Sequence, residues 1–169
     1  TASSSSTISF TSGIDDTYDS YVFKFYDIHP ATDNTFLTFQ ADTGTNTNYN
    51  QTITSTFFKA LHNESGSTSA LSYDTASDLA QSTSFQYLSR NVGNDNDQSI
   101  SGTLQVFSPS SSTFVKHFIS RTNVYTNDDY SIDSAIAGYF NTTTALTRFQ
   151  FKMASGNIDS GVIKLYGIS

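Results

Sequence analysis

The sequence predicts an all-β protein, an antiparallel β-sandwich that is jelly-roll-like and has about 8–10 strands. The first observation is composition: 24 Thr and 28 Ser stand among 169 residues, whereas only 14% of residues are charged and Glu occurs once. Good helix formers are therefore scarce, and the residues that suit a pleated surface, Thr, Phe, Tyr, Ile and Val, are plentiful. The second observation is a regular alternation of apolar and polar residues.

Alternation is clearest near the beginning of the chain. Residues 20–28 place Phe23 and Phe25 on one face of an extended segment. Lys24 and Ile28 fall on the opposite face, as expected of a strand. The same pattern predicts ten strands, in chain order at residues 8–10, 20–28, 35–41, 52–61, 84–89, 99–107, 113–121, 135–141, 146–154 and 162–168.

Turn-forming residues separate these segments. Gly, Asn, Asp, Ser and Pro gather at residues 13–16, 30–34, 42–50, 63–67, 93–97, 108–110, 127–129 and 155–157. One short helix is predicted at residues 74–81, where Ala76, Leu79 and Ala80 have the spacing to face inward together. No linker or repeat divides the chain, so residues 1–169 are expected to form a single β-sandwich domain.

Charge and cysteine content exclude several classes of function. Eight basic residues against fifteen acidic ones give a net charge of −7, with no basic cluster for nucleic acid or an anionic membrane. No apolar run approaches the roughly 18 residues of a spanning helix, and the opening residues lack the pattern of an export signal. The absence of cysteine excludes disulfides, zinc fingers and thiol nucleophiles. We expect a soluble chain with no membrane insertion.

Residues 93–97, Gly-Asn-Asp-Asn-Asp, form the densest group of oxygen-bearing side chains. Calcium takes six to eight oxygen ligands, and such a loop can supply several. An EF-hand pattern fails, because counting from Asp95 places Ile100 where glycine is required and Val106 where glutamate is required. Asn and Asp are also the residues that tight turns select. A turn is the favoured interpretation and a cation site the alternative, and we expect no cofactor.

Catalytic signatures are missing from the sequence. His29, His62 and His117 stand in separate segments without metal-ligand spacing, and His117 is expected to be a partly buried structural histidine. Neither a GxSxG motif nor a phosphate-binding glycine loop occurs, and no compact carboxylate pair is present. We expect no catalytic residue and no enzyme activity.

Tyrosines beside polar loops are the best candidates for binding. An amphipathic ring can stack on a sugar or bury at a protein interface. Tyr49, Tyr125 and Tyr130 are therefore the candidate glycan or interface contacts, with Tyr18 and Tyr73 in similar surroundings. The alternative is that these rings lie over the end of the sandwich.

Four stretches together resemble a known group of proteins. They are YVFKFYDIHP at 21–30, GNDNDQSISG at 93–102, SPSSSTFVKHFIS at 108–120 and SGNIDSGVIKLYGI at 155–168. As a set they resemble small virion structural proteins of tailed bacteriophages, particularly marine phages. The similarity extends over almost the whole chain.

This resemblance implies a surface subunit of the virion, made in the cytoplasm of the bacterial host, that decorates the head or forms part of a tail fibre assembly. Its expected partners are other virion proteins and copies of itself in a closed homo-oligomer, with a trimer as the predicted number. The alternative function is a carbohydrate-binding module that recognises glycans of the host surface. The two functions are compatible on one fibre.

Overall fold

The computed structural model describes all 169 residues, and its regular elements are all β-strands. Every pairing between neighbouring strands is antiparallel, which confirms the predicted all-β antiparallel sandwich. No helix long and apolar enough to cross a membrane is present. The strands are β1 (Ile8–Phe10), β2 (Ser20–Pro30), β3 (Leu37–Thr43), β4 (Ile53–Asn63), β5 (Ser69–Tyr73), β6 (Gln86–Tyr87), β7 (Ile100–Phe107), β8 (Lys116–Tyr125), β9 (Tyr130–Phe140), β10 (Leu146–Met153) and β11 (Ile158–Ile168).

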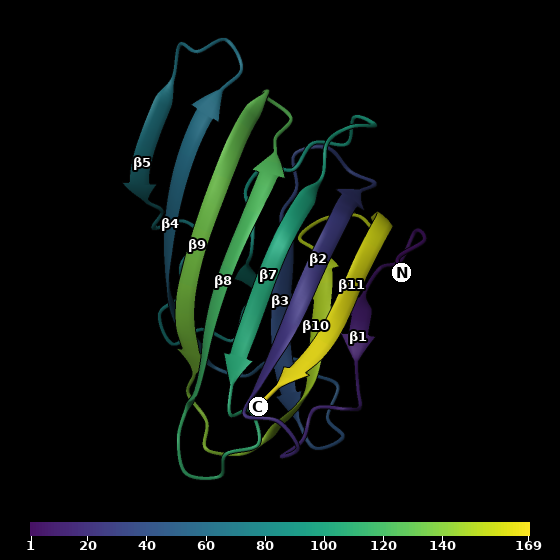
Figure 1. Cartoon of the computed structure of the whole chain (residues 1–169), viewed down its shortest axis with the longest axis vertical. Coiled ribbons are helices and arrows are strands. Elements are labelled where there is room, and N and C mark those ends of the chain that lie inside the picture. Colours follow the sequence, from purple (N-terminus) through teal and green to yellow (C-terminus); the bar gives the residue numbers. More distant parts are fainter.

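Two sheets of unequal size form the layers. A seven-stranded sheet has the order β11-β2-β7-β8-β9-β4-β5, and a four-stranded sheet has the order β1-β10-β3-β6. Figure 1 shows the larger sheet toward the viewer, with β3 and β10 behind its right half. The smaller sheet is therefore too narrow to cover the whole inner face of the larger one. The jelly-roll likeness stays a prediction.

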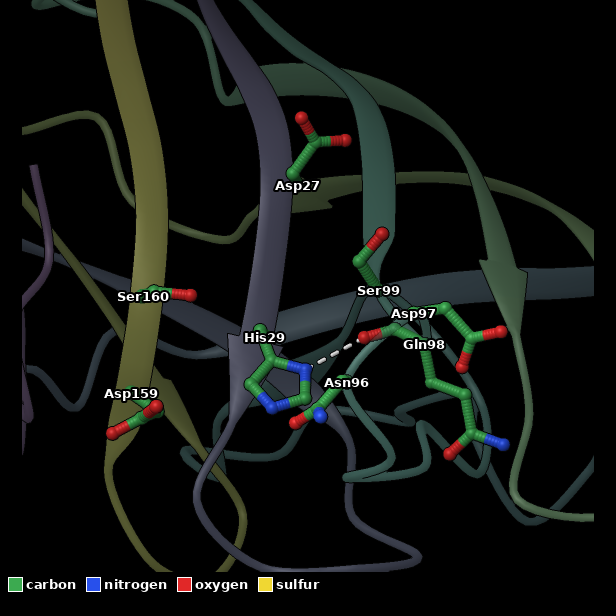
Figure 2. Close-up of a pocket in the computed structure, with 8 residues that line it drawn as sticks. All are labelled: Asp27, His29, Asn96, Asp97, Gln98, Ser99, Asp159 and Ser160. Atoms are coloured by element: carbon green, nitrogen blue, oxygen red, sulfur yellow. Dashed lines mark hydrogen bonds between the residues drawn. The ribbon is translucent and has the colours of Figure 1, made fainter.

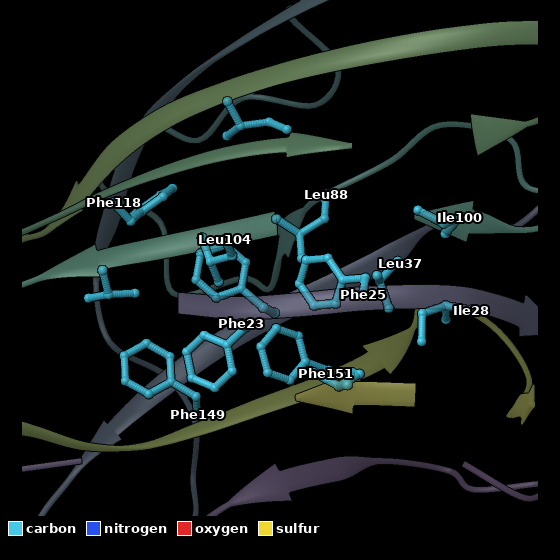
Figure 3. Packing of buried hydrophobic residues seen from close by; sticks show 14 of the residues in the cluster. Phe23, Phe25, Ile28, Leu37, Leu88, Ile100, Leu104, Phe118, Phe149 and Phe151 are labelled. Carbon is cyan, nitrogen blue, oxygen red and sulfur yellow. The ribbon is translucent and has the colours of Figure 1, made fainter. Parts of the chain in front are cut away.

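One continuous aromatic core joins the two sheets. The ring of Phe151 on β10 packs against Phe23 and Phe25 of β2, with ring centroids 5.0 and 5.4 Å apart. It also contacts Phe39 of β3 and Phe10 of β1. Figure 3 shows the rings of Phe23, Phe25 and Phe151 between the sheets, together with Leu104, Leu88 and Ile28. Such rings bury large apolar areas, and each well-oriented pair adds about 0.5–1.5 kcal/mol.

A bulge in β2 changes which side chains face this core. Asp27 has a φ of 48°, and the pairing with β7 shifts between Phe25 and Ile28. One extra residue reverses the alternation, so Ile28 is fully buried in the core. The predicted placement of Ile28 on the Lys24 face is therefore wrong. Gly161 of β11 passes so close to Asp27 that a Cβ atom there would lie 2.6 Å from the Asp27 carbonyl oxygen.

The segment between β5 and β7 covers the part of the large sheet that the small sheet leaves open. Asp74 is 7% exposed, and its carboxylate lies 2.9 Å from Lys59 Nζ and 3.3 Å from Arg90 Nε. Its other oxygen accepts a hydrogen bond from the main-chain N–H of Ala76, which closes a turn. The predicted helix at 74–81 is wrong, since this Asp-led turn replaces it.

The predicted strands all overlap observed ones; the strand at residues 8–10 has the predicted ends, and the others have shifted ends. Strand β6 is only two residues long, and β8 and β9 extend farther toward their shared turn than expected. Strand β5 was not predicted. It lies at the edge of the large sheet and pairs only with β4, and in its sequence Ser-Ala-Leu-Ser-Tyr two apolar residues are adjacent, so polar and apolar residues do not alternate regularly.

Candidate functional site

The outward face of the seven-stranded sheet carries exposed apolar side chains on neighbouring strands. On β8 the buried and exposed positions alternate strictly from Lys116 to Val124. Ile119 points away from the core and is 55% exposed, and Phe58 on β4 is 48% exposed. Single exposed apolar side chains are common on protein surfaces, whereas a contiguous group of them is typical of an interaction surface.

Small residues of β9 create a depression between these two side chains. Ala137 pairs with Thr56 of β4 on one side and with Ile119 of β8 on the other, and Ala135 pairs with Phe58 and Arg121. Two adjoining hollows of about 430 and about 230 Å³ result, and both are lined by Thr56, Ile119 and Ala137. We call this surface the β8–β9 strip, defined by Thr56, Phe58, Phe107, His117, Ile119, Ala135, Ala137 and Tyr139.

The charged side chains beside the strip are already partnered. Arg121 donates three hydrogen bonds to the two carboxylate oxygens of Asp133, the shortest at 2.6 Å. The hydrogen bonds from Arg121 hold the pKa of Asp133 below its usual value. Toward the other edge, Lys24 Nζ lies 5.3 Å from the ring centre of Tyr166. This face therefore presents few isolated charges that a partner would have to desolvate.

A separate hollow of about 330 Å³ lies at one end of the same face. Ser131 of β9 forms its floor, because it pairs with His62 of β4 on one side and with Tyr125 of β8 on the other. Asn123 and the β4–β5 turn residue Glu64 complete the wall. We call it the Tyr125 hollow.

Carboxylates surround the phenol of Tyr125. Its hydroxyl donates a hydrogen bond to Asp129 Oδ1 over 3.2 Å. Removal from water, together with the nearby carboxylates of Asp129 and Glu64, raises the pKa of Tyr125 to about 12. The hydroxyl therefore stays protonated at physiological pH, and the surroundings favour donors over anions.

The three candidate tyrosines occupy different environments. Tyr125 lines the hollow described above. Tyr130 is half-buried and packs against the core, in line with the alternative that a ring covers the end of the sandwich. Tyr49 is only 5% exposed, and its main-chain N–H donates to Asp42 Oδ2. Its ring therefore has no face open to a sugar or a partner, contrary to the sequence-based expectation.

The three histidines lie in different parts of the structure. His117 is exposed on the β8–β9 strip, so its predicted partial burial is wrong. His62 lines the Tyr125 hollow. His29 lies in an acidic hollow of about 450 Å³ beside the β2 bulge. Figure 2 shows the carboxylates of Asp27, Asp97 and Asp159 on three sides of His29.

The acidic hollow does not assemble a hydrogen-bonded catalytic group. His29 Nδ1 lies 2.7 Å from the main-chain carbonyl oxygen of Gln98, as the dashed line in Figure 2 marks. That carbonyl takes the place that a carboxylate would hold in a Ser-His-Asp triad. Asp27 instead accepts from the hydroxyl of Ser101, and Asp159 accepts from Ser4. The structure brings no three His, Asp or Glu side chains together in a metal-binding arrangement, in residues 93–97 or elsewhere.

Sequence reasoning missed the β8–β9 strip, although a signal for it exists. Residues 57 and 58 are both Phe, and so one of them must leave the core of a regular strand. Phe57 is fully buried and Phe58 is the one exposed. Adjacent large apolar residues in a strand therefore predict apolar surface on both of its faces, and on the outer face the ring of Phe58 packs edge-to-face only against Tyr73 of β5.

Comparison with known proteins finds no matching family model, no similar curated protein and no similar solved structure.

Proposed function

We propose that the protein is a structural subunit that self-associates through the β8–β9 strip as part of a larger assembly. The single observation that carries the proposal is the group of exposed apolar side chains around Ile119 and Phe58, which adjoins two hollows on the outward face of the large sheet. The resemblance to phage virion proteins supplies the setting, which is the outside of a phage particle in a decorating or fibre position.

The size of the face supports this role. Seven strands about 4.8 Å apart and about ten residues long give a face of roughly 1,000 Å². A standard protein interface needs about 800 Å² from each partner. The outer face of the large sheet is thus large enough for one stable interface without help from the loops.

The shape and charge of the strip favour a second copy of this chain as the occupant. The projecting Ile119 stands directly beside the small Ala137, so one copy carries both a knob and an adjoining depression. A two-fold axis through the strip would place each knob over the depression of the other copy. The ion pair of Arg121 and Asp133 is neutral overall, so two copies would not repel each other there.

Measurement of solution mass tests the association. We expect the wild-type chain to sediment as an oligomer at micromolar concentration. The charged substitution Ile119→Asp should weaken the association about a hundredfold or more, because it buries an unpaired carboxylate. The control Phe114→Asp changes an apolar residue that is 72% exposed but lies outside the strip, and it should leave the mass unchanged.

A wild-type chain that stays monomeric at high concentration would overturn the proposed association. The same measurement tests the predicted trimer. Face-to-face packing about a two-fold axis gives even numbers of chains, so the solution mass distinguishes a trimer from this packing. The place on a virion needs a separate test, in which antibodies against this chain should label the surface of intact phage particles. Purified particles that lack the chain would contradict the virion setting.

A further inference from the structure

The Tyr125 hollow presents a set of polar atoms that the fold leaves available. Asn123 uses its amide N–H groups on Ser131 Oγ and on the Ile132 carbonyl, which leaves its side-chain oxygen free. Ser131 accepts that bond and keeps its own hydroxyl proton to donate. His62 Nδ1 lies 2.8 Å from the Asn63 carbonyl oxygen, so the neutral ring has Nε2 free as an acceptor.

The hollow combines these atoms with apolar surface. It is open to solvent and lies on the outward face, where the register fixes Ser131 between His62 and Tyr125. Two strand spacings separate the flanking rings, about 9.6 Å in all. Its volume of about 330 Å³ falls within the range of small-ligand pockets.

Charge narrows the class of ligand. Glu64 lines the hollow and Asp129 lies behind Tyr125, while no Lys or Arg side chain is among the lining residues. An anion such as a phosphate, a sulfate or an acidic sugar would meet two carboxylates without a compensating cation. A ligand with several hydroxyl donors and one apolar face meets the available acceptors and the aromatic ring.

We propose that the Tyr125 hollow binds one neutral hexopyranose residue of a glycan. The apolar face of the sugar lies on Tyr125, and its hydroxyls donate to Glu64 and to the side-chain oxygen of Asn123. The hydroxyl of Ser131 donates to a sugar oxygen. This site does not depend on the proposed self-association, because none of its lining residues belongs to the β8–β9 strip.

A glycan array followed by titration of the hits tests the site. We expect the wild-type protein to bind neutral hexose glycans on the array and not to bind acidic ones. Tyr125→Ala should weaken the titrated affinity by about tenfold or more, and Glu64→Gln by about tenfold. Tyr166→Ala is the matched control, since that tyrosine is exposed on β11 outside the hollow, and its affinity should equal that of the wild type.

Three outcomes would overturn the site. They are no binding to any neutral glycan, a preference for acidic or amine ligands, and unchanged affinity in both hollow variants. Glu64 is an exposed turn residue, so Glu64→Gln keeps the test valid if Tyr125→Ala fails to fold. Monomeric Ile119→Asp should retain wild-type affinity, so that loss of association and loss of sugar binding can be told apart.

Discussion

The two faces of the seven-stranded sheet are built from the same strands and differ in what covers them. On β8, Phe118 points inward and is 1% exposed, whereas its neighbour Ile119 points outward and is 55% exposed. The inner ring packs against Phe39 and Phe140, with centroids 5.1 and 5.5 Å away. The outer side chain adjoins Ala137 and two shallow hollows. Apolar character therefore does not by itself decide which face is the core.

Some polar side chains of β8 are buried on the inner face, so polar character does not decide the exposed face either. Lys116 and Thr122 lie on the inner face of β8 and are completely or almost completely buried. The ammonium group of Lys116 donates to the carbonyl oxygens of Phe114 and Thr142, and the hydroxyl of Thr122 donates to that of Leu88. A polar group is tolerated inside when its hydrogen bonds are satisfied. Partners, and not hydropathy, distinguish the two faces.

The sharpest way to break this comparison is to truncate the two neighbours on β8 separately. Phe118→Ala should lower the free energy of unfolding by about 3–5 kcal/mol, because it opens a cavity among packed rings. Ile119→Ala should cost less than about 1 kcal/mol in the monomer, since little surrounds that side chain. Urea denaturation at low protein concentration measures both. Equal losses would show that the outer face is packed within the single chain.

A second contrast sets a buried ion pair against an exposed one. Asp74→Asn should lower the free energy of unfolding by about 1–3 kcal/mol at neutral pH, because Lys59 and Arg90 lose their shared carboxylate. Asp133→Asn should cost under about 1 kcal/mol, as is usual for surface pairs. Chemical denaturation of both variants beside the wild type gives the comparison.

The same Asp74 variant carries a pH signature. Burial raises the pKa of Asp74, but Lys59 and Arg90 outweigh it and hold the pKa below 3.8. The carboxylate therefore contributes its full stabilisation above 3.8 and loses it as pH falls through the lower folded-state pKa. The difference in unfolding free energy between the wild type and Asp74→Asn should therefore disappear in that acid range. A gap that persists at still lower pH would contradict the ion-pair explanation.

The smallest expected effect belongs to Lys116→Met. The variant removes a buried charge, which favours folding, but leaves two carbonyl oxygens without a donor, which disfavours it. The free energy of unfolding should therefore change by no more than about 1 kcal/mol at neutral pH. Burial lowers the pKa of Lys116 below 10.5. The unfolded chain thus binds more protons than the folded one between the two values, and this residue's contribution to stability rises with pH there.

Denaturation of wild type and Lys116→Met side by side up to pH 10.5 measures this trend. The difference in unfolding free energy should move in favour of the wild type as pH rises, because tyrosine ionisation affects both chains equally. A difference that stays constant over this range would mean that the lysine is solvated in the folded state.

Alternation was sufficient to predict the fold class and ten of the strands, because a period of two needs no tertiary information. It was insufficient wherever one residue broke the period. The bulge at Asp27 moved Ile28 to the core face, and the hydrogen bond from the Tyr49 main-chain N–H to the Asp42 carboxylate holds a loop tyrosine in a buried position. The turn at Asp74 depends on Lys59 and Arg90, which are distant in sequence.

The candidate surfaces were less predictable for a related reason. Sequence pattern assigns Ile119 and His117 to one face of β8, but it does not tell which face a second sheet will cover. The Tyr125 hollow joins residues of β4, β8 and β9, whose register is set only when the sheet forms. Tyr125 could be singled out as an aromatic residue near polar loops, whereas its neighbours His62, Asn123 and Ser131 could not be grouped with it.

The pairing of early strands with late ones has a consequence for biosynthesis. Strand β1 joins the small sheet through β10, and β2 pairs with β11, so the first and last strands close the structure together. Residues near Ala2 also bond to the chain near Gly161. A growing chain on the ribosome must therefore wait until β10 and β11 have emerged before its aromatic rings can be enclosed. During that interval the apolar side chains are exposed, and we expect chaperones to bind this protein most strongly then.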